Sequence, residues 1–361
     1  MPFESGSFTL SVFHIYEDIP GNALELFAAR SAGKLDEVKE EPQVGWVSGR
    51  QLLDRRIEEE TAVVGAGYIY LQLRFAQRKI PASLLKAECG MEEMAYSKAS
   101  SCVDIPRKVK KEIRKSVMER LLPQMAPQFS GIPMVLDRGS KVLYMGASSQ
   151  KQIDMFNGFF LETLKIKLTQ LNQDLIFVEN KMDVCSYKGM TLAQGEGDEM
   201  FPMRDFLTWL WYFSEEEKGE IAVDDHGDFA VTLDGPLCFV ADGKGALESV
   251  VRKGNPLRSA EALTALKVGK KMRKAKIIMA KNNLIWSAVF DADKFSFSSV
   301  ALPEGEEMEA GERFTERMEH VRDFIAVLRA LFAKFLAETE AISWKDKTRK
   351  IMAWVESRES F

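Results

Sequence analysis

The chain has 361 residues, of which 46% are hydrophobic and 29% charged, and its formal net charge is −5. This composition excludes a disordered, collagen-like or membrane-embedded protein, and the length suggests about two domains. No apolar run approaches the roughly 18 residues of a membrane-spanning helix. The first five residues lack the basic and apolar regions of a signal peptide. We therefore expect a globular protein of the cytoplasm.

The cysteines and histidines give no sign of a common metal or redox site. The four cysteines are scattered without a C-x-x-C pair, and none of the three histidines lies three or four residues from another. The chain also lacks the glycine-rich phosphate loop, the serine nucleophile elbow and the zinc-protease motif. These absences exclude the commonest enzyme classes, and we expect no catalytic residue, no metal ligand and no cofactor.

The N-terminal part combines strands with a short helix. Alternating apolar and polar residues predict strands over 7–16 and 68–75, and a helix is predicted over 22–31. One face of the second strand carries Tyr68, Tyr70, Gln72 and Arg74. Aromatic and basic side chains on an open sheet face suit contact with nucleic acid, whereas an ordinary half-solvated face is the more common explanation.

Residues 80–129 are helix-rich and polar and show no strand pattern, so we expect a helical arm. Its second helix follows the N-cap candidate Asp104, carries an apolar residue every four positions from Val109 to Leu121, and ends at Pro123. The opposite side of this helix is cationic, because six basic residues and one acid lie between positions 107 and 115.

An acidic turn is predicted beyond the middle of the chain. A hairpin over 131–146 and a helix over 149–167 come first, and the Gly- and acid-rich residues 189–200 are the best linker candidate. Asp224, Asp225 and Asp228 then surround His226. Such a group could hold Mg²⁺ in a metal-dependent nuclease. A turn between two strands favours the same residues for local reasons.

A second cationic run occupies positions 267–276, with six basic residues and no acid. It closes a helix that begins near Ser259, with Gly269 as the predicted stop, and continues into a strand over 276–281. Cations at the C-terminus of a helix also stabilise its dipole, which requires no ligand.

Charge is therefore strongly segregated along the chain. The two runs carry +5 and +6 while the whole chain carries −5, so the other 342 residues carry −16. A polyanion would be repelled by most of this surface and attracted at two patches. The alternative for either run alone is a solvated helix face.

The C-terminal third returns to strands and then a long helix. Strands are predicted over 275–281, 284–290 and 295–301, and apolar residues from Phe314 to Phe335 follow a 4-3 spacing. Heptad spacing can mark a dimer seam, but the width of the apolar stripe favours packing on the chain's own sheet.

The predicted fold class is α+β. We expect a central α+β region of residues 1–80 and 131–188, a helical arm of residues 81–130, and a C-terminal α+β region of residues 189–361.

The order of several short motifs resembles the RdgC family of recombination-associated DNA-binding proteins. No single motif is specific, and the resemblance depends on their order and spacing along most of the chain. The motifs are Gly45-Trp46-Val47, Lys79-Ile80-Pro81, Leu121-Leu122-Pro123 with Phe129-Ser130, Val135-Leu136-Asp137, the 259–270 helix with Gly269-Lys270, and the closing amphipathic helix.

The resemblance implies a horseshoe-shaped monomer with antiparallel sheets that pairs at two places into a ring-shaped homodimer. Duplex DNA would pass through the basic hole with little sequence preference, with single-stranded DNA as a second ligand. Such a protein limits the access of RecA to DNA and associates with the nucleoid. The arm would form one ring contact, and the C-terminal part would contribute to the other.

Charge and resemblance together give the candidate site residues. The candidate DNA contacts are Arg74, Arg107, Lys108, Lys111, Arg114, Lys115, Lys270, Lys271, Arg273 and Lys274. The candidate dimer contacts are Leu122, Met125 and Phe129. The family often continues Leu-Leu-Pro with Arg-Ala-Phe, whereas Gln124, Met125 and Ala126 follow here, and residues 344–361 have no counterpart in the family.

Three functions are thus open at the level of sequence. The leading interpretation is a non-enzymatic, sequence-tolerant DNA-binding homodimer. The second is a metal-dependent nuclease that acts on recombination substrates through the acidic turn. The third is an interaction protein that dimerises through its C-terminal helix and has no role on DNA.

Overall fold

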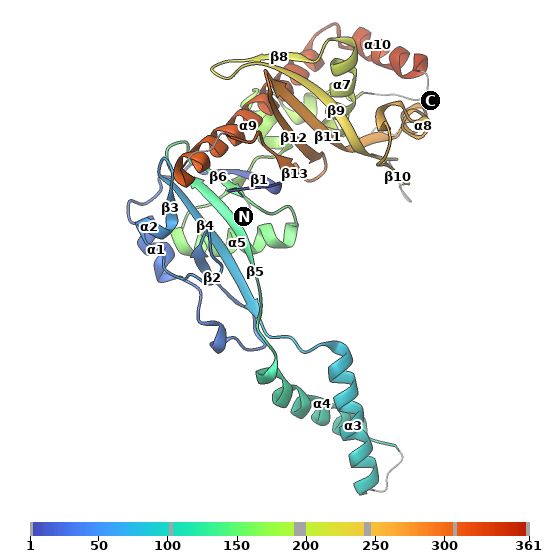
Figure 1. Ribbon diagram of the computed structural model, residues 1–361. Coiled ribbons are helices and arrows are strands. Elements are labelled where there is room, and N and C mark those ends of the chain that lie inside the picture. The colour runs from blue at the N-terminus through green and yellow to red at the C-terminus, as the bar shows by residue number, and fades with distance from the viewer. Residues whose placement is uncertain (1–2, 101–103, 191–199, 242–246, 306–308, 359–361) are drawn as a thin grey trace.

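The computed structural model describes residues 3–100, 104–190, 200–241, 247–305 and 309–358. Figure 1 shows an elongated arrangement, in which helices α3 (Ala82–Ser100) and α4 (Arg107–Leu121) project away from two sheet-based parts. Helices are combined with strands whose pairings are all antiparallel. The predicted α+β class is therefore confirmed.

The strands form one long sheet in the order β10-β9-β11-β12-β13-β1-β6-β5-β4-β2. Short strands β3, β7 and β8 pair with β4, β1 and β9. The strands are β1 (Phe8–His14), β2 (Gln43–Ser48), β3 (Val63–Val64), β4 (Tyr68–Gln77), β5 (Gln128–Asp137), β6 (Val142–Met145), β7 (Thr169–Gln170), β8 (Glu220–Val223), β9 (Gly227–Val240), β10 (Glu248–Val251), β11 (Lys271–Lys281), β12 (Leu284–Asp291) and β13 (Ser296–Ala301).

The remaining helices pack on this sheet or on one another. They are α1 (Ala23–Ala29), α2 (Glu59–Ala62), α5 (Gln150–Leu164), α6 (Gln173–Glu179), α7 (Pro202–Glu216), α8 (Ala260–Lys267), α9 (Ala310–Glu340) and α10 (Trp344–Ser357). Short 3₁₀ turns are η1 (Leu35–Glu37), η2 (Leu122–Gln124), η3 (Val184–Ser186) and η4 (Pro256–Arg258). In the part of the chain that the structure describes, no helix has both the length and the apolar character needed to cross a bilayer.

The N-terminal half of the sheet packs one face on α1 and α5. Trp46 of β2 is fully buried there, and its indole Nε1 donates to the Thr163 hydroxyl at 2.9 Å. The rings of Phe27 and Phe156 meet the Trp46 ring edge-on. Burial of these large side chains, each contributing about 2–3 kcal/mol, fixes α1 and α5 on this face.

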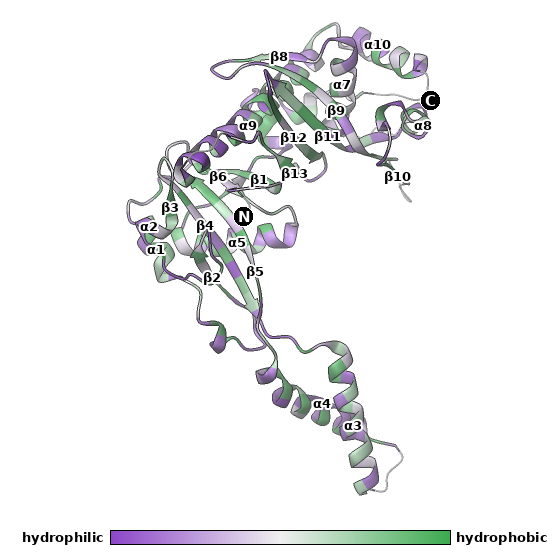
Figure 2. Ribbon diagram, viewed as in Figure 1, coloured by the Kyte–Doolittle hydropathy of each residue, from purple (hydrophilic) through white to green (hydrophobic). Residues whose placement is uncertain are grey.

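The long helix α9 packs on the chain's own sheet, as the width of its apolar stripe predicts. Its buried residues include Phe314, Val321, Leu328 and Phe335, and they join the core formed with α7 and strands β9 to β13. Figure 2 shows hydrophobic stretches in β11 and β12, whereas the outer side of α9 is hydrophilic. The apolar residues at heptad spacing therefore pack within one chain.

The prediction that one face of β4 is open to solvent is wrong. Tyr68, Tyr70, Gln72 and Arg74 are all buried, with relative exposures of 0–5%. The ring of Tyr70 packs 5.4 Å from that of Phe314 in α9, and the Gln72 amide donates to the Gly49 carbonyl at 2.7 Å. The strand is buried on both faces because α9 and the segment after β2 cover the face that sequence alone left open.

The C-terminal residues 344–358 are an integral part of the fold. Helix α10 places Trp354 edge-on against Trp211 of α7, with ring centroids 5.5 Å apart. The guanidinium of Arg358 lies over both tryptophan rings, 4.6 Å from each centroid, and pairs with Glu215. This stacking contributes to closing the apolar core against solvent.

The second cationic run lies mainly on a strand, not on a helix. Helix α8 ends at Lys267, and Gly269 has a φ of +80°, as expected of a residue that stops a helix. Strand β11 begins at Lys271, so the cations that follow alternate across a sheet. The predicted start of this strand at residue 275 or 276 is thus several residues late. Most of the predicted 189–200 linker, residues 191–199, lies outside the described residues.

The chain enters the helical arm at the end of β4 and leaves it at the start of β5, where Gln77 is paired with Gln128. It has an apolar cluster of its own, built on Ile80, Leu85, Val117 and Leu121. The cluster is separate from the two clusters of the sheet-based parts.

Arg78 fastens this arm to the sheet-based part. Its guanidinium donates to the carbonyls of Val38 (2.8 Å), Pro123 (3.2 Å) and Met125. Val38 belongs to the segment after α1, whereas Pro123 and Met125 belong to the base of the arm. A cavity of about 730 Å³ lies between these two segments, so packing contributes little there and the planar fork of Arg78 carries the connection.

We expect Arg78→Gln to widen the range of arm orientations, because glutamine cannot bridge three carbonyls. Double electron–electron resonance between spin labels at positions 83 and 151 would show a broader distribution of label–label distances than in the parent. Arg56→Gln removes a guanidinium from an exposed ion pair with Asp54 and is the matched control. Identical distributions in Arg78→Gln and the parent would contradict this role.

Candidate nucleic-acid interface

The outer side of α4 carries the least neutralised cations of the predicted site. Arg107, Lys108, Lys111 and Arg114 are exposed, and none of them takes part in an ion pair among the described residues. Lys115 is also exposed and lies 3.8 Å from Glu119 on the same helix. An exposed pair of this kind contributes little, so Lys115 remains available to an anion.

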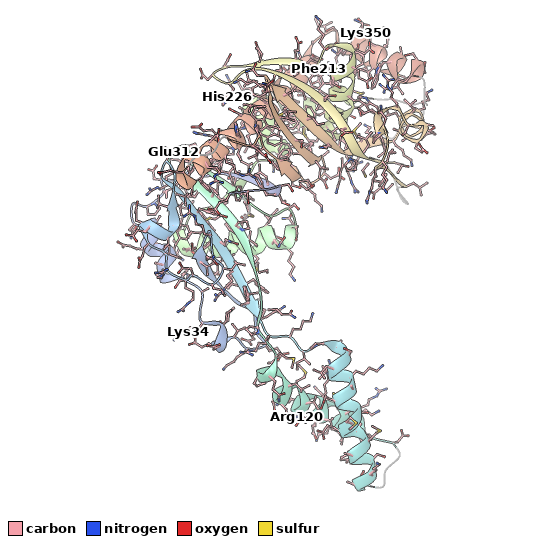
Figure 3. The ribbon with its side chains drawn as sticks, viewed as in Figure 1. Lys34, Arg120, Phe213, His226, Glu312 and Lys350 are labelled. Atoms are coloured by element: carbon pink, nitrogen blue, oxygen red, sulfur yellow. The ribbon has the colours of Figure 1, made fainter. Side chains whose placement is uncertain are left out.

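The apolar stripe of α4 explains this placement. Val117 and Leu121 are buried against Leu85 of α3, so the 3.6-residue period turns the cations toward solvent. One side of the α3–α4 contact is also held by Arg120, labelled in Figure 3, which lies 3.0 Å from Glu88 and 3.1 Å from Glu92. The arm therefore presents its unpaired cations on a helix that is locally well fixed.

Three of the six cations of the second run are paired with carboxylates. Lys271 is only 4% exposed and lies 3.3 Å from Asp205. Arg273 pairs with Glu248 at 3.0 Å, and Lys274 pairs with Asp291 at 2.9 Å. Lys270 is partly exposed, and its ammonium donates to the Ser249 hydroxyl at 2.7 Å. This cluster therefore attracts a polyanion less than its sequence suggests.

Asp205 is the centre of a buried polar network. Besides Lys271, its carboxylate accepts from the Tyr187 hydroxyl at 2.8 Å and from the Met190 amide at 3.0 Å. Burial raises the pKa of Asp205, while Lys271 and the two hydrogen bonds act in the opposite direction. Lys271 is thus a structural counterion, and its assignment as a DNA contact is corrected.

Arg74 is likewise an internal residue. It is 2% exposed, and its guanidinium donates to the carbonyls of Leu52 (3.2 Å) and Gly33. Burial lowers the pKa of its guanidinium. Because a phosphate cannot reach it without disrupting these loops, the assignment of Arg74 as a DNA contact is also corrected.

The three candidate dimer contacts occupy different environments. Leu122 and Met125 are partly buried against the apolar cluster of the arm, whereas Phe129, at the start of β5, is 40% exposed. Phe129 is therefore the most accessible of the three to a second chain.

The two cationic clusters do not meet within one chain. Figure 1 places α4 at one end of the molecule and the first residues of β11 in the other sheet-based part, with the N-terminal half of the sheet between them. A DNA molecule that contacts both must therefore extend along the long dimension of the protein or pass between two copies.

Asp224 and Asp225 lie in the tight turn between β8 and β9, whereas Asp228 lies in β9 opposite Ala222. Asp225 has a φ of +62° between β8 and β9, and the His226 imidazole Nδ1 lies 2.6 Å from an Asp323 carboxylate oxygen on α9. Figure 3 shows His226 at this hairpin. Among the residues that the structure describes, no three His, Cys, Asp or Glu side chains gather closely enough to hold a metal ion.

The structural roles of Arg78 and Asp205 were not predicted from the sequence. Arg78 gives no local signal, because its partners are backbone carbonyls of distant segments. Asp205 does give a local signal, since it is the one acid in the apolar stretch 202–213 of α7. A charged residue on a buried helix requires a counterion, and that rule points to a cation elsewhere in the chain.

Comparison with known proteins agrees with the motif pattern. The model of the RdgC family, described as "Putative exonuclease, RdgC", matches residues 10–182. These residues include the N-terminal half of the sheet and the whole arm. The match covers just under half of the chain and supports the resemblance to the RdgC family over these residues. None of the curated proteins compared with the chain matches it.

We expect Lys271→Met to lower the free energy of unfolding by about 3–5 kcal/mol at pH 7, because it leaves the buried Asp205 carboxylate without its counterion. Lys274→Met, whose side chain is 35% exposed, should cost about 1 kcal/mol or less. Urea denaturation would measure both values. Equal values for the two variants would contradict the structural role of Lys271.

The Lys271→Met deficit should also depend on pH. Burial holds the folded pKa of Asp205 above its unfolded value, so protonation favours the folded state. Because Lys271 lowers this pKa, Lys271→Met raises it further, so the deficit is largest at neutral pH and shrinks as the pH falls. Urea titrations at several pH values would test this, and a deficit that grows on acidification would contradict it.

Proposed function

We propose that the chain is a non-enzymatic DNA-binding protein that recognises the phosphate backbone without reading sequence. The observation that supports this proposal is the group of exposed, unpaired cations on the outer side of α4: Arg107, Lys108, Lys111 and Arg114. They lie on a chain that is acidic overall. The match of residues 10–182 to the RdgC family model supports a recombination-related DNA-binding protein.

The mechanism is neutralisation of phosphates with release of condensed counterions. Four arm contacts predict a slope of about −3.6 in the logarithm of affinity against the logarithm of salt concentration. The arm cations supply most of the attraction. Lys270, Arg273 and Lys274 contribute less, because each must first leave a partner within the chain.

The finer part of the proposal concerns assembly. Two chains pair through the arm and through the C-terminal part into a ring that encloses duplex DNA, and the exposed Phe129 at the base of the arm belongs to one contact. The ring covers DNA against RecA and so limits recombination. The same arm cations bind single-stranded DNA, because both forms present phosphates.

Replacement of Arg107, Lys108, Lys111 and Arg114 by glutamine should weaken duplex binding by about two orders of magnitude near 100 mM salt and flatten the salt dependence. Fluorescence anisotropy with two duplexes of unrelated sequence would measure both effects. The matched control carries the same four-charge change at exposed lysines outside both cationic runs: Lys34, Lys151, Lys345 and Lys350.

Two outcomes would contradict the DNA proposal. If the arm variant binds like the parent while the control variant is weakened, the arm is not the interface. If the parent retains neither single- nor double-stranded DNA at low salt, the chain is an interaction protein instead. Light scattering in the same buffers tests the dimer, whose expected mass is twice the 40.8 kDa of one chain.

A nuclease is the second candidate, because the matching family model carries the word exonuclease in its description. The acidic turn is its only predicted metal site. We expect no cleavage of end-labelled DNA by the pure protein with Mg²⁺ or Mn²⁺ over hours. Cleavage that is abolished by Asp224→Asn together with Asp228→Asn would establish the nuclease and overturn the non-enzymatic proposal.

A further inference from the structure

The two sides of the α3–α4 contact differ in a way that the proposed function does not explain. One side is closed by Arg120, which pairs with Glu88 and Glu92 of α3. The other side holds a cavity of about 470 Å³. Residues from both helices line it: Leu85, Lys86, Cys89, Gly90 and Glu93 from α3, and Arg114 from α4.

The charges at this cavity favour an anion. Lys86 and Arg114 are exposed, lie on opposite helices, and take part in no ion pair among the described residues. The Glu93 carboxylate is the one acid in the lining and lies 3.9 Å from the Lys110 ammonium. Two cations that line one groove repel each other unless an anion lies between them.

The floor of the groove is open to a bulky group. Gly90 lies in the middle of α3, where glycine costs about 0.5–1 kcal/mol relative to alanine. A β-carbon at position 90 would meet no atom within 4 Å, so no packing contact requires glycine there. The missing side chain leaves the groove wider at the level of Lys86 and Cys89.

We propose that this groove seats a phosphodiester of a DNA strand, held between Lys86 of α3 and Arg114 of α4. This inference rests on the proposed function and extends its site to a second helix. Arg107, Lys111 and Arg114 lie at i, i+4 and i+7, hence along one side of α4. The backbone of one strand runs along that stripe and enters the groove at Arg114, where Lys86 supplies a contact that the sequence analysis did not identify.

Cys89 provides a built-in reporter of occupancy. Its thiol is partly buried in the groove, whereas Cys185 in η3 is exposed far from the arm. Alkylation by N-ethylmaleimide followed by peptide mass spectrometry would compare the two rates. A 30-base-pair duplex should slow labelling of Cys89 several-fold and leave Cys185 unchanged. Inorganic phosphate at the same phosphate concentration distinguishes a free ion from a strand, and we expect it to give no protection.

Lys86→Gln tests the same groove by affinity. Loss of one phosphate contact should reduce the salt slope by about 1 and weaken duplex binding several-fold near 100 mM salt. Lys98→Gln is the matched control, because Lys98 is exposed on α3 and does not line the cavity. Circular dichroism would verify that both variants keep their helices.

The outcomes separate this inference from the proposed function. If the parent binds DNA but Cys89 is not protected and Lys86→Gln matches Lys98→Gln, the groove is not the phosphate site, whereas DNA binding by the arm stands. Protection of Cys89 by inorganic phosphate alone would also overturn the assignment to a DNA strand. If the parent binds no DNA at all, both proposals fail.

Discussion

The pairing of β1 with β13 on one side and β6 on the other is the constraint on which the arrangement depends. Through this single strand the C-terminal and N-terminal parts share one antiparallel sheet, and α9 packs across the two parts where Phe314 meets Tyr70. The arm extends from the end of the β4–β5 ladder, so its base is attached to the sheet. Arg78 sets the direction in which the arm leaves the sheet.

Neutralisation decides which cations are available for binding. Both runs are conspicuous in the sequence. Among the described residues α4 keeps four exposed cations without acid partners, because its neighbours on α3 direct their carboxylates to Arg120 and Lys110. On β11 the cations meet acids from other strands and from α7, of which the buried Asp205 is the clearest case. Local charge density is therefore a poor measure of attraction when the chain supplies its own counterions.

The sequence predicted features that depend on neighbouring residues and failed where distant segments meet. The α4 helix and its cationic side follow from a local period, and the structure confirms them. Of the apolar stripe predicted from Val109 to Leu121, the residues from Ile113 onward join the cluster of the arm. The buried states of Arg74 and Lys271 could not be predicted, since the covering segments and the counterion lie far along the chain. Arg78 depends on backbone carbonyls, which leave no trace in side-chain pattern.

The most direct test of the account is a salt titration of parent protein with two duplexes of equal length and unrelated sequence. Recognition of the phosphate backbone predicts affinities that agree within about two-fold at each salt concentration. It also predicts a slope of log affinity against log salt concentration steeper than about −3, set by the arm cations. Affinities that differ by orders of magnitude between the duplexes, or binding that is insensitive to salt, would contradict recognition of the phosphate backbone.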